Sequence, residues 1–387
     1  MKPRVDCPGC GAHRWVEGLV LRRQPAVLNY RFRSAAEARS VARGDVTLRQ
    51  CRECGLVFNA TFDGARIPYD ERYENRQGSS PTFRSHVDDR VARLGRVAGV
   101  RGGRLLEVGC GKGEFLRRAA ELLGAEADGY DTSYEGPASV DDGRVRFHAG
   151  YLSASGVTGP YNALICRHVV EHVPGIGEFF EGLAGIARAA GDPVVVVETP
   201  RFEWIVENGC LWDVFYEHCN YFTEPSLAHL ARRAGLRVTR QTPVFGGQYQ
   251  WMELRVMRRA PARGVAGPGI PRGGELARFS RAAGRQRERL AEWIREGRRG
   301  RPWAVWGAGA KGVALVNLLP RLRPACVVDV NPAKQGSTIP GTSVPVRGPS
   351  DAGLAGLGVV VITNPNYADE VKAELSASGF GGNILSL

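Results

Sequence analysis

The chain has 387 residues, 43% of them hydrophobic and 24% charged, which is the composition of an ordinary globular protein with two or three domains. It has no apolar run near the ~20 residues that span a bilayer, and residues 1–7 have no apolar signal core, so we expect a cytoplasmic protein that needs no membrane. The formal net charge is +12, but the arginines that carry most of it are scattered, which argues against a nucleic-acid partner and is compatible with a phosphate-bearing small substrate.

Two C-x-x-C pairs lie in the first predicted domain, residues 1–75, and a glycine follows each of them. Four thiolates at this spacing are typical of a closed, tetrahedral Zn²⁺ site, whereas a redox pair needs only one such motif. Between the pairs, residues 27–32 alternate like a strand, so we expect the metal to clip a small β-subdomain. The sequence therefore predicts a structural zinc site made by Cys7, Cys10, Cys51 and Cys54.

Residues 76–260 alternate between strand and helix patterns, which predicts an α/β domain. The helices are expected near residues 85–98, 113–123, 176–190 and 224–234. The strands are expected near residues 104–108, 125–130, 144–148, 161–166 and 193–198, with a late pair at 236–241 and 250–257 that suggests an antiparallel edge.

A glycine-rich turn follows the first of these strands. The strand ends in Glu107, and three alternating glycines then lead into a helix, which leaves free backbone N–H groups at the turn. About twenty residues on, Asp131 ends the second strand, where an acid suits the two hydroxyls of a ribose. The pattern E-x-G-x-G-x-G resembles the first motif of class I S-adenosylmethionine (SAM) methyltransferases. It places the cofactor on Glu107, Gly109, Cys110, Gly111, Gly113 and Asp131.

A histidine pair follows the fourth strand, at the carboxyl edge of the predicted sheet, where α/β folds bind ligands. We expect Arg167, His168 and His172 to line the SAM site. A structural role is the main alternative. A metal site with Glu171 is disfavoured, because no distant third ligand can be identified.

A second polar segment, Tyr216-Glu217-His218, lies among aromatic residues just before the helix for which Thr223 is the expected N-cap. An imidazole beside a carboxylate can act as a general base near neutral pH. Neighbouring side chains diverge in an irregular segment, so Glu217 need not touch His218. A buried polar cluster that ties domains together is the alternative interpretation.

Residues 261–301 are expected to form a linker and then a charged helix, and residues 302–387 begin a second α/β unit. In this unit a strand leads into Gly307-x-Gly309-x-x-Gly312, and Asp329 ends the next strand. The pattern fits a dinucleotide site, but about 85 residues make only half of such a fold. We therefore expect a packing turn, or a surface that holds the nucleotide of a substrate, rather than a site for NAD.

These motifs, in this order, resemble the sugar C-methyltransferase family of deoxysugar biosynthesis. The resemblance covers essentially the whole chain. It implies a zinc-binding N-terminal domain, a class I SAM core and a C-terminal Rossmann-like domain. It also implies a ketosugar substrate attached to a nucleoside diphosphate.

Within this family, the glutamate–histidine pair matches Glu217 and His218, and the histidine is implicated in deprotonation. A tyrosine of the N-terminal segment also lines the family's site, and Tyr73 is the best match here, with Tyr69 second. Family members often carry Tyr-His before Glu-His, whereas this chain carries Phe215-Tyr216.

The sequence thus predicts a SAM-dependent C-methyltransferase in which a keto group acidifies the neighbouring C–H and His218 removes the proton. Glu217 and Tyr216 would orient this base or stabilise the enolate. The alternatives are an O- or N-methyltransferase of a natural-product scaffold, and a non-catalytic protein that keeps the SAM fold for binding. The sugar, the methylated carbon and the oligomeric state are not determined by the sequence.

Overall fold

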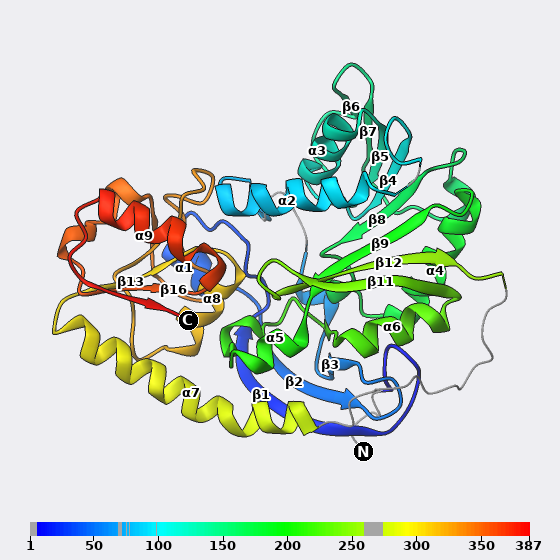
Figure 1. Ribbon diagram of the computed structural model, residues 1–387. Coiled ribbons are helices and arrows are strands. Elements are labelled where there is room, and N and C mark those ends of the chain that lie inside the picture. Colours follow the sequence, from blue (N-terminus) through cyan, green and yellow to red (C-terminus); the bar gives the residue numbers. More distant parts are fainter. Residues whose placement is uncertain (1–5, 69–71, 75, 77, 98, 259–273) are drawn as a thin grey trace.

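A computed structural model of the chain describes residues 6–68, 72–74, 76, 78–97, 99–258 and 274–387 (Figure 1). Its strands form three sheets, of four, eight and five strands. The predicted linker at residues 261–274 lies almost wholly outside the described residues. No helix in the described part of the chain is long and apolar enough to cross a membrane.

The first sheet has the order β1-β2-β3-β10. Its strands are β1 (Trp15–Pro25), β2 (Arg43–Cys51), β3 (Val57–Asn59) and β10 (Asn220–Tyr221), and a short helix, α1 (Ala35–Arg39), connects β1 to β2. All neighbouring strands in it are antiparallel. The last strand comes from a distant part of the chain, directly after the predicted Glu217-His218 pair.

The strand expected at residues 27–32 is not formed. Tyr30 and Phe32 make only isolated bridges, to Tyr73 and to Thr338. The physical reason is that its main chain bonds elsewhere: the N–H of Leu28 donates to the Glu217 carboxylate, and Asn29 and Arg31 bond to the main chain of Glu74 and Arg72. The side chains of Val27, Leu28, Tyr30 and Phe32 are each at most 4% exposed. This stretch is a core segment held between other elements.

The central sheet has eight strands in the order β11-β12-β9-β8-β4-β5-β7-β6. Five of its strands, from β9 to β7, are parallel, and β11 and β12 add an antiparallel edge, as expected. The bounds are β4 (Arg104–Val108), β5 (Glu126–Tyr130), β6 (Ser139–Val140), β7 (Val145–His148), β8 (Ala163–Arg167), β9 (Val194–Pro200), β11 (Leu236–Val244) and β12 (Tyr249–Val256).

The helices around the central sheet are α2 (Pro81–Leu94), α3 (Glu114–Leu123), α4 (Ile176–Ala189), α5 (Phe202–Glu207) and α6 (Glu224–Arg233). Helix α2 begins four residues before the expected position, because Ser80 caps it by accepting from the N–H of Phe83 and Pro81 suits its first turn. The expected cap Thr223 is confirmed, and it forms a reciprocal capping box with Ser226.

The third sheet is fully parallel, in the order β15-β14-β13-β16-β17. Its strands are β13 (Trp303–Trp306), β14 (Cys326–Val328), β15 (Val346–Arg347), β16 (Val359–Ile362) and β17 (Asn383–Ser386), and its helices are α8 (Ala310–Leu318) and α9 (Ala368–Ala377). The long helix α7 (Gly274–Arg298) runs below this sheet and along β1 (Figure 1).

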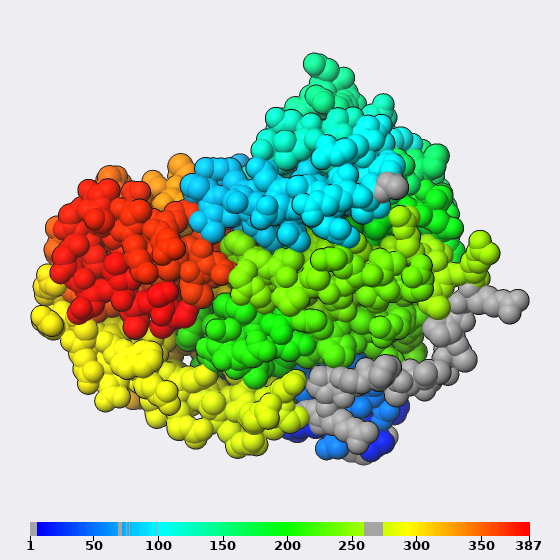
Figure 2. All heavy atoms as spheres, viewed as in Figure 1, coloured from blue at the N-terminus to red at the C-terminus, as the bar shows by residue number. Residues whose placement is uncertain are grey.

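The three sheets share their cores. One cluster of buried side chains joins the first sheet to the third, and another joins the cysteine pairs to the central sheet. Helix α2 reaches across to the C-terminal lobe, where Oγ of Ser80 donates to Glu370 of α9 at 2.8 Å. Figure 2 shows the light-blue atoms of α2 lying against the red atoms of the C-terminal part of the chain. The carboxyl ends of the parallel strands of both α/β units therefore open onto a common space.

Candidate active site

A cavity of about 1870 Å³ lies where the three sheets meet. Its walls include the glycine turn after β4, the polar segment before β10 and the glycine turn after β13. Pockets for one small ligand usually measure about 300–1,000 Å³, so this cavity has room for a cofactor and a second molecule.

The turn after β4 is shaped by glycines in the left-handed region. Gly109, Gly111 and Gly113 have φ values of +77°, +54° and +79°. Gly109 and Gly111 line the cavity together with Cys110, whereas Gly113 does not. A Cβ on Gly113 would lie 2.4 Å from the ring of Phe147, so this glycine is needed for packing.

Asp131 lies beside this turn, as predicted. One of its carboxylate oxygens accepts from the N–H of Gly111 at 2.8 Å, and the other accepts from the N–H and hydroxyl of Ser133. The acid therefore fixes the turn. Each carboxylate oxygen can accept more than one hydrogen bond, so Asp131 can also bind a ligand hydroxyl.

A carboxyl group and a guanidinium, those of Glu107 and Arg167, are buried at the ends of β4 and β8. Nε of Arg167 donates to Glu198 at 2.7 Å, and the other oxygen of Glu198 lies 2.7 Å from Nε2 of His86. Burial raises the pKa of Glu107 to about 8. Among the described residues, Oε2 of Glu107 and Nη2 of Arg167 have no hydrogen-bond partner, although both residues line the cavity. Such unpaired buried groups are suited to a charged ligand.

His168 also lines the cavity, and its backbone has a φ of +54°, which is unusual for a residue with a side chain. Its Nδ1 lies 3.4 Å from Glu171, and its ring packs edge-on against Tyr249. Strained backbone of this kind often lies at functional sites.

The rings of His172 and His218 both line the cavity and pack edge to face, with their centroids 4.8 Å apart. Nδ1 of His172 donates to the carbonyl oxygen of Glu217 at 3.0 Å, which leaves Nε2 as the acceptor. Burial lowers the pKa of both imidazoles, so each is neutral at pH 7. A neutral imidazole can accept a proton from a substrate.

The carboxylate of Glu217 points away from His218, as the sequence analysis allowed. It accepts from the N–H of Leu28, and its other oxygen lies 3.4 Å from the hydroxyl of Tyr73. Burial raises the pKa of Glu217 to about 7, against the opposing hydrogen bonds from Leu28, Asn29 and Tyr73. The structure therefore brings Tyr73 and Glu217 together at the cavity. Tyr69 lies outside the described residues.

Tyr216 does not reach the cavity, contrary to expectation. Its side chain is fully buried, and its hydroxyl accepts from the N–H of Asp63 at 2.9 Å. A Cβ on Gly44 would lie 2.1 Å from its ring, so the two residues pack tightly. Three consecutive side chains cannot all face one cavity, and here Phe215 lines it instead, with its ring 4.2 Å from that of His218. The role expected for Tyr216, orienting the base or stabilising an enolate, is therefore withdrawn.

The glycine turn after β13 opens onto the same cavity. A Cβ on Gly307 or Gly309 would meet no atom within 4 Å, whereas one on Gly312 would lie 1.9 Å from the carbonyl oxygen of Gly307. The first two glycines thus border open space, and Gly312 serves packing. The N–H of Ala308 donates to Asp329 at 2.7 Å, which fixes the turn.

Two lysines of the C-terminal unit were not predicted to belong to the site. Nζ of Lys334 donates to the carbonyl oxygen of Ala308, and Nζ of Lys311 lies 2.8 Å from Asp213. Both lysines line the cavity. Lys311 could have been identified from its place inside the glycine motif, whereas the sequence around Lys334 carries no comparable signal.

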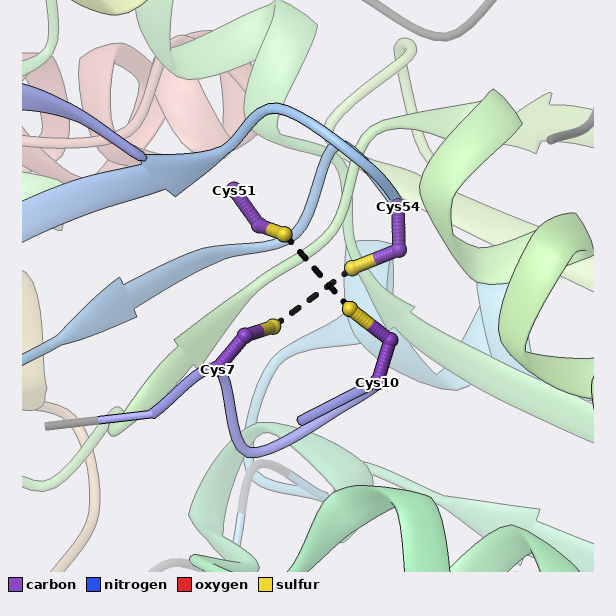
Figure 3. Close-up of side chains that lie close together, drawn as sticks. All are labelled: Cys7, Cys10, Cys51 and Cys54. Carbon is purple, nitrogen blue, oxygen red and sulfur yellow. Dashed lines mark hydrogen bonds between the residues drawn. The ribbon is translucent and has the colours of Figure 1, made fainter. Parts of the chain in front are cut away.

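The four cysteines of the predicted zinc site meet at one point (Figure 3). The sulfur atoms of Cys7 and Cys54 are 3.5 Å apart, those of Cys10 and Cys51 are 3.6 Å apart, and all four lie within 4.8 Å of one another. Tetrahedral Zn²⁺ with bonds of about 2.3 Å separates its sulfur ligands by about 3.8 Å, so the cluster fits this metal.

Comparisons with known proteins agree with this geometry. Residues 82–241 match the family described as methyltransferase domain, and residues 269–385 match the family described as C-methyltransferase C-terminal domain. The C-methyltransferase NovU of Streptomyces niveus is 25% identical over 393 residues, which covers 96% of this chain and 92% of NovU.

Two solved methyltransferase structures are similar to part of this chain. A 1,6-didemethyltoxoflavin-N1-methyltransferase of Burkholderia thailandensis is 20% identical to this chain, with a TM-score of 0.34. The aligned region covers 46% of this chain and 79% of that protein. The magnesium protoporphyrin IX methyltransferase of Synechocystis PCC 6803 is 18% identical and covers 45% and 84%, also with a TM-score of 0.34.

The central sheet, its glycine turn and the matched domain define a class I SAM-dependent methyltransferase. The C-terminal unit, a separate parallel α/β domain, is the C-terminal domain of C-methyltransferases. The chain is therefore a SAM-dependent C-methyltransferase, with the methyltransferase core and the C-terminal domain that the resemblance in the sequence implied.

Proposed function

We propose that this enzyme methylates a carbon atom of a nucleotide-activated ketosugar through an enolate. The observation that carries the proposal is the single cavity shared by the SAM turn, the neutral His172–His218 pair and the open glycine turn of the C-terminal domain. The likeness to NovU along nearly the whole chain supports carbon as the methylated atom.

SAM would bind along the end of β4. Gly109, Cys110 and Gly111 would contact it, and Asp131 would accept from the ribose hydroxyls. The amino-acid end of SAM carries an ammonium and a carboxylate, which complement the unpaired oxygen of Glu107 and the unpaired nitrogen of Arg167. His168 and His172 would complete the wall. When bound, SAM supplies a methyl group activated by its sulfonium.

The nucleotide part of the acceptor would lie on the C-terminal glycine turn. Gly307 and Gly309 leave open space, and helix α8 begins directly after them, so its N–H groups can bind a diphosphate. Lys334 adds a buried positive charge beside this turn. This arrangement directs the sugar toward Glu217 and His218.

His218 would act as the base. The ring takes a proton from the carbon next to the ketone, and the C–H electron pair becomes the enolate. That pair then forms the new C–C bond while the S–CH₃ bond breaks and its electrons stay on sulfur. Tyr73 and Glu217 would bind the sugar at the same wall, and Glu217 is the alternative base.

The experiment that tests this proposal is exchange of the sugar's α-proton with solvent deuterium in the presence of S-adenosylhomocysteine, with a nucleoside-diphosphate ketosugar as the probe. We expect exchange without methyl transfer. Failure to exchange, together with methylation of oxygen or nitrogen, would replace the C-methylation mechanism with that of an O- or N-methyltransferase.

We also propose a structural zinc ion on Cys7, Cys10, Cys51 and Cys54. The distances fit, and four thiolates leave the metal no open coordination position for catalysis. The domain boundaries proposed with it are 1–75 for the zinc domain, 76–260 for the SAM core, 261–301 for the linker and helix, and 302–387 for the C-terminal domain.

A further inference from the structure

We propose that Asn220 is a positioning residue for the His172–His218 pair, and that the two cysteine pairs hold the chain segments on either side of it. The proposal rests on the proposed function, because that function assigns the histidines to proton removal. Asn220 itself lies behind the cavity wall and does not line the cavity, whereas His172, Val173 and Glu217 do.

The amide of Asn220 connects the two histidine-bearing segments. Its Nδ2 donates to the carbonyl oxygens of Val173 at 2.7 Å and of Val170 at 3.2 Å, and the residue is 1% exposed. These carbonyls lie on either side of His172 in the sequence. In the opposite direction, His172 donates to the carbonyl of Glu217. Three hydrogen bonds thus fix the segment around His172 against the segment around His218.

The second cysteine pair continues directly into a strand that holds the same segment. After Cys54 the chain forms β3, which pairs with β10 so that Phe58 lies opposite Asn220. The N–H of Asn59 donates to the carbonyl of Cys219 at 2.9 Å. The residues that follow His218 are therefore hydrogen-bonded through their main chain to β3, the strand that follows the second cysteine pair.

The first cysteine pair holds the other segment. The carbonyl of Pro8 accepts from the N–H of Gly177 at 3.1 Å, in the first turn of α4 and five residues after His172. A Cβ on Gly177 would lie 2.8 Å from the carbonyl oxygen of Gly9, so this close approach requires glycine. The chain around the cysteine cluster therefore contacts both histidine-bearing segments, and the Asn220 amide bonds these segments to each other.

A small shift of these two segments would therefore displace the imidazole of His218, the proposed base. A misplacement of about 1 Å in a catalytic group can cost about 100-fold in rate. Asn220→Leu keeps a similar volume but removes two of the three hydrogen bonds between the segments, while the SAM turn is untouched. We expect a roughly 10- to 100-fold fall in kcat, with KM and Kd for SAM unchanged.

Asn317→Leu is the matched control. Nδ2 of Asn317 also donates to two carbonyls, those of Val313 and Pro340, at 2.9 Å each, but the residue does not line the cavity. We expect comparable destabilisation with unchanged kcat. If the two variants lose kcat equally, or if Asn220→Leu keeps full kcat, Asn220 is merely structural and the proposal is wrong.

A second pair of variants tests the cysteine contact. Gly177→Ala forces the first cysteine pair to shift, whereas Gly185→Ala, in the same helix, would meet only a methyl group at 3.8 Å. The readout is the nuclear Overhauser effect between the His172 and His218 rings, measured without substrate, alongside metal content. We expect a full metal complement in both variants and a weakened ring-to-ring signal only in Gly177→Ala.

An unchanged signal in Gly177→Ala and in Asn220→Leu would overturn the inference whatever the enzyme methylates. If the ring-to-ring signal is lost in these variants but the wild-type enzyme never exchanges the sugar proton, the positioning role stands and the proposed enolate mechanism is wrong. The experiments therefore distinguish failure of the positioning role from failure of the proposed function.

Discussion

The hydroxyl of Tyr73 lies 3.4 Å from Oε2 of Glu217, although 144 positions separate the two residues in the sequence. The isolated bridge between Tyr30 and Tyr73 holds this tyrosine at the edge of the first domain. The contact turns the Glu217 carboxylate away from the His218 ring, so the adjacent acid and base face different parts of one cavity. A substrate that reaches both must lie between the N-terminal domain and the central sheet.

Replacement of the proposed base should separate chemistry from binding. We expect His218→Ala to lower turnover by roughly 10²–10⁴-fold and to keep wild-type affinity for SAM, because the imidazole acts on the acceptor. Proton exchange in the presence of S-adenosylhomocysteine is the informative assay. His229→Ala, on α6 and outside the cavity, serves as the control. Wild-type exchange in His218→Ala would exclude this ring as the base and leave Glu217 as the next candidate.

A side chain in the cofactor turn should abolish SAM binding. Gly111→Val introduces a β-branched residue at a φ of +54° and fills the space beside Asp131. Gly124→Val, at a φ of +63° after α3 and outside the cavity, imposes the same backbone strain without touching the ligand. Titration calorimetry should show loss of binding only in the first variant. Equal affinities in the two would refute the site.

The cysteine cluster should carry one zinc ion per chain. We expect Cys51→Ser to lose the metal and to unfold at a lower temperature, because metal binding at such sites contributes folding free energy. Cys326→Ser changes a cysteine that is equally buried but lies in β14, so it should retain the metal. Elemental analysis of protein purified without chelators provides the test, and wild-type protein free of zinc would contradict it.

Glu217 should make stability depend on pH. Its pKa is raised from 4.5 to about 7, so the folded state holds the proton more tightly than the unfolded state does. The resulting stabilisation is complete below pH 4.5 and is lost as the pH rises toward 7. Its size is about 3 kcal/mol, at 1.36 kcal/mol per pH unit.

Glu217→Gln removes this dependence. Between pH 4.5 and 7 the free energy of unfolding of wild type should fall by about this amount relative to the variant, as measured by denaturant unfolding. Groups common to both proteins cancel in the difference. Parallel curves for the two proteins across this range would show that Glu217 titrates normally.

The C-terminal glycine turn should not bind NAD. The C-terminal unit, at about 85 residues, has half the size of a dinucleotide-binding fold, so it cannot enclose both nucleotides. Micromolar protein should therefore leave NADH fluorescence unchanged. An enhancement that NAD⁺ reverses would establish a dinucleotide site.

Elements and motifs that depend on a short stretch of sequence could be predicted. The turn from Glu107 to Gly113 and the two C-x-x-C pairs depend on residue type and spacing, so the strands of the central sheet, the glycine turn and the sulfur cluster lie where expected. The first sheet could not be predicted in the same way. Its last strand, β10, has only two residues, and it exists because β3 pairs with it from far away.

The same limit applies to the site. The direction of a side chain in an irregular segment depends on its packing partners, and no local pattern around Tyr216 indicates that it packs against Gly44 and Asp63. Lys334 is held at the cavity by the carbonyl oxygen of Ala308, which lies 26 positions earlier in the chain. Contacts between domains, rather than local patterns, decide which polar residues meet.

Strand β10 has a practical consequence for protein engineering. The N-terminal folding unit is discontinuous, because it borrows Asn220 and Tyr221 from inside the methyltransferase core. A chimera joined near residue 75 would pair one parent's β3 with the other parent's β10. Exchange of acceptor preference between related enzymes should therefore transfer the segment from Asp213 to Thr223 together with the N-terminal residues, so that the partners of this strand pair stay matched.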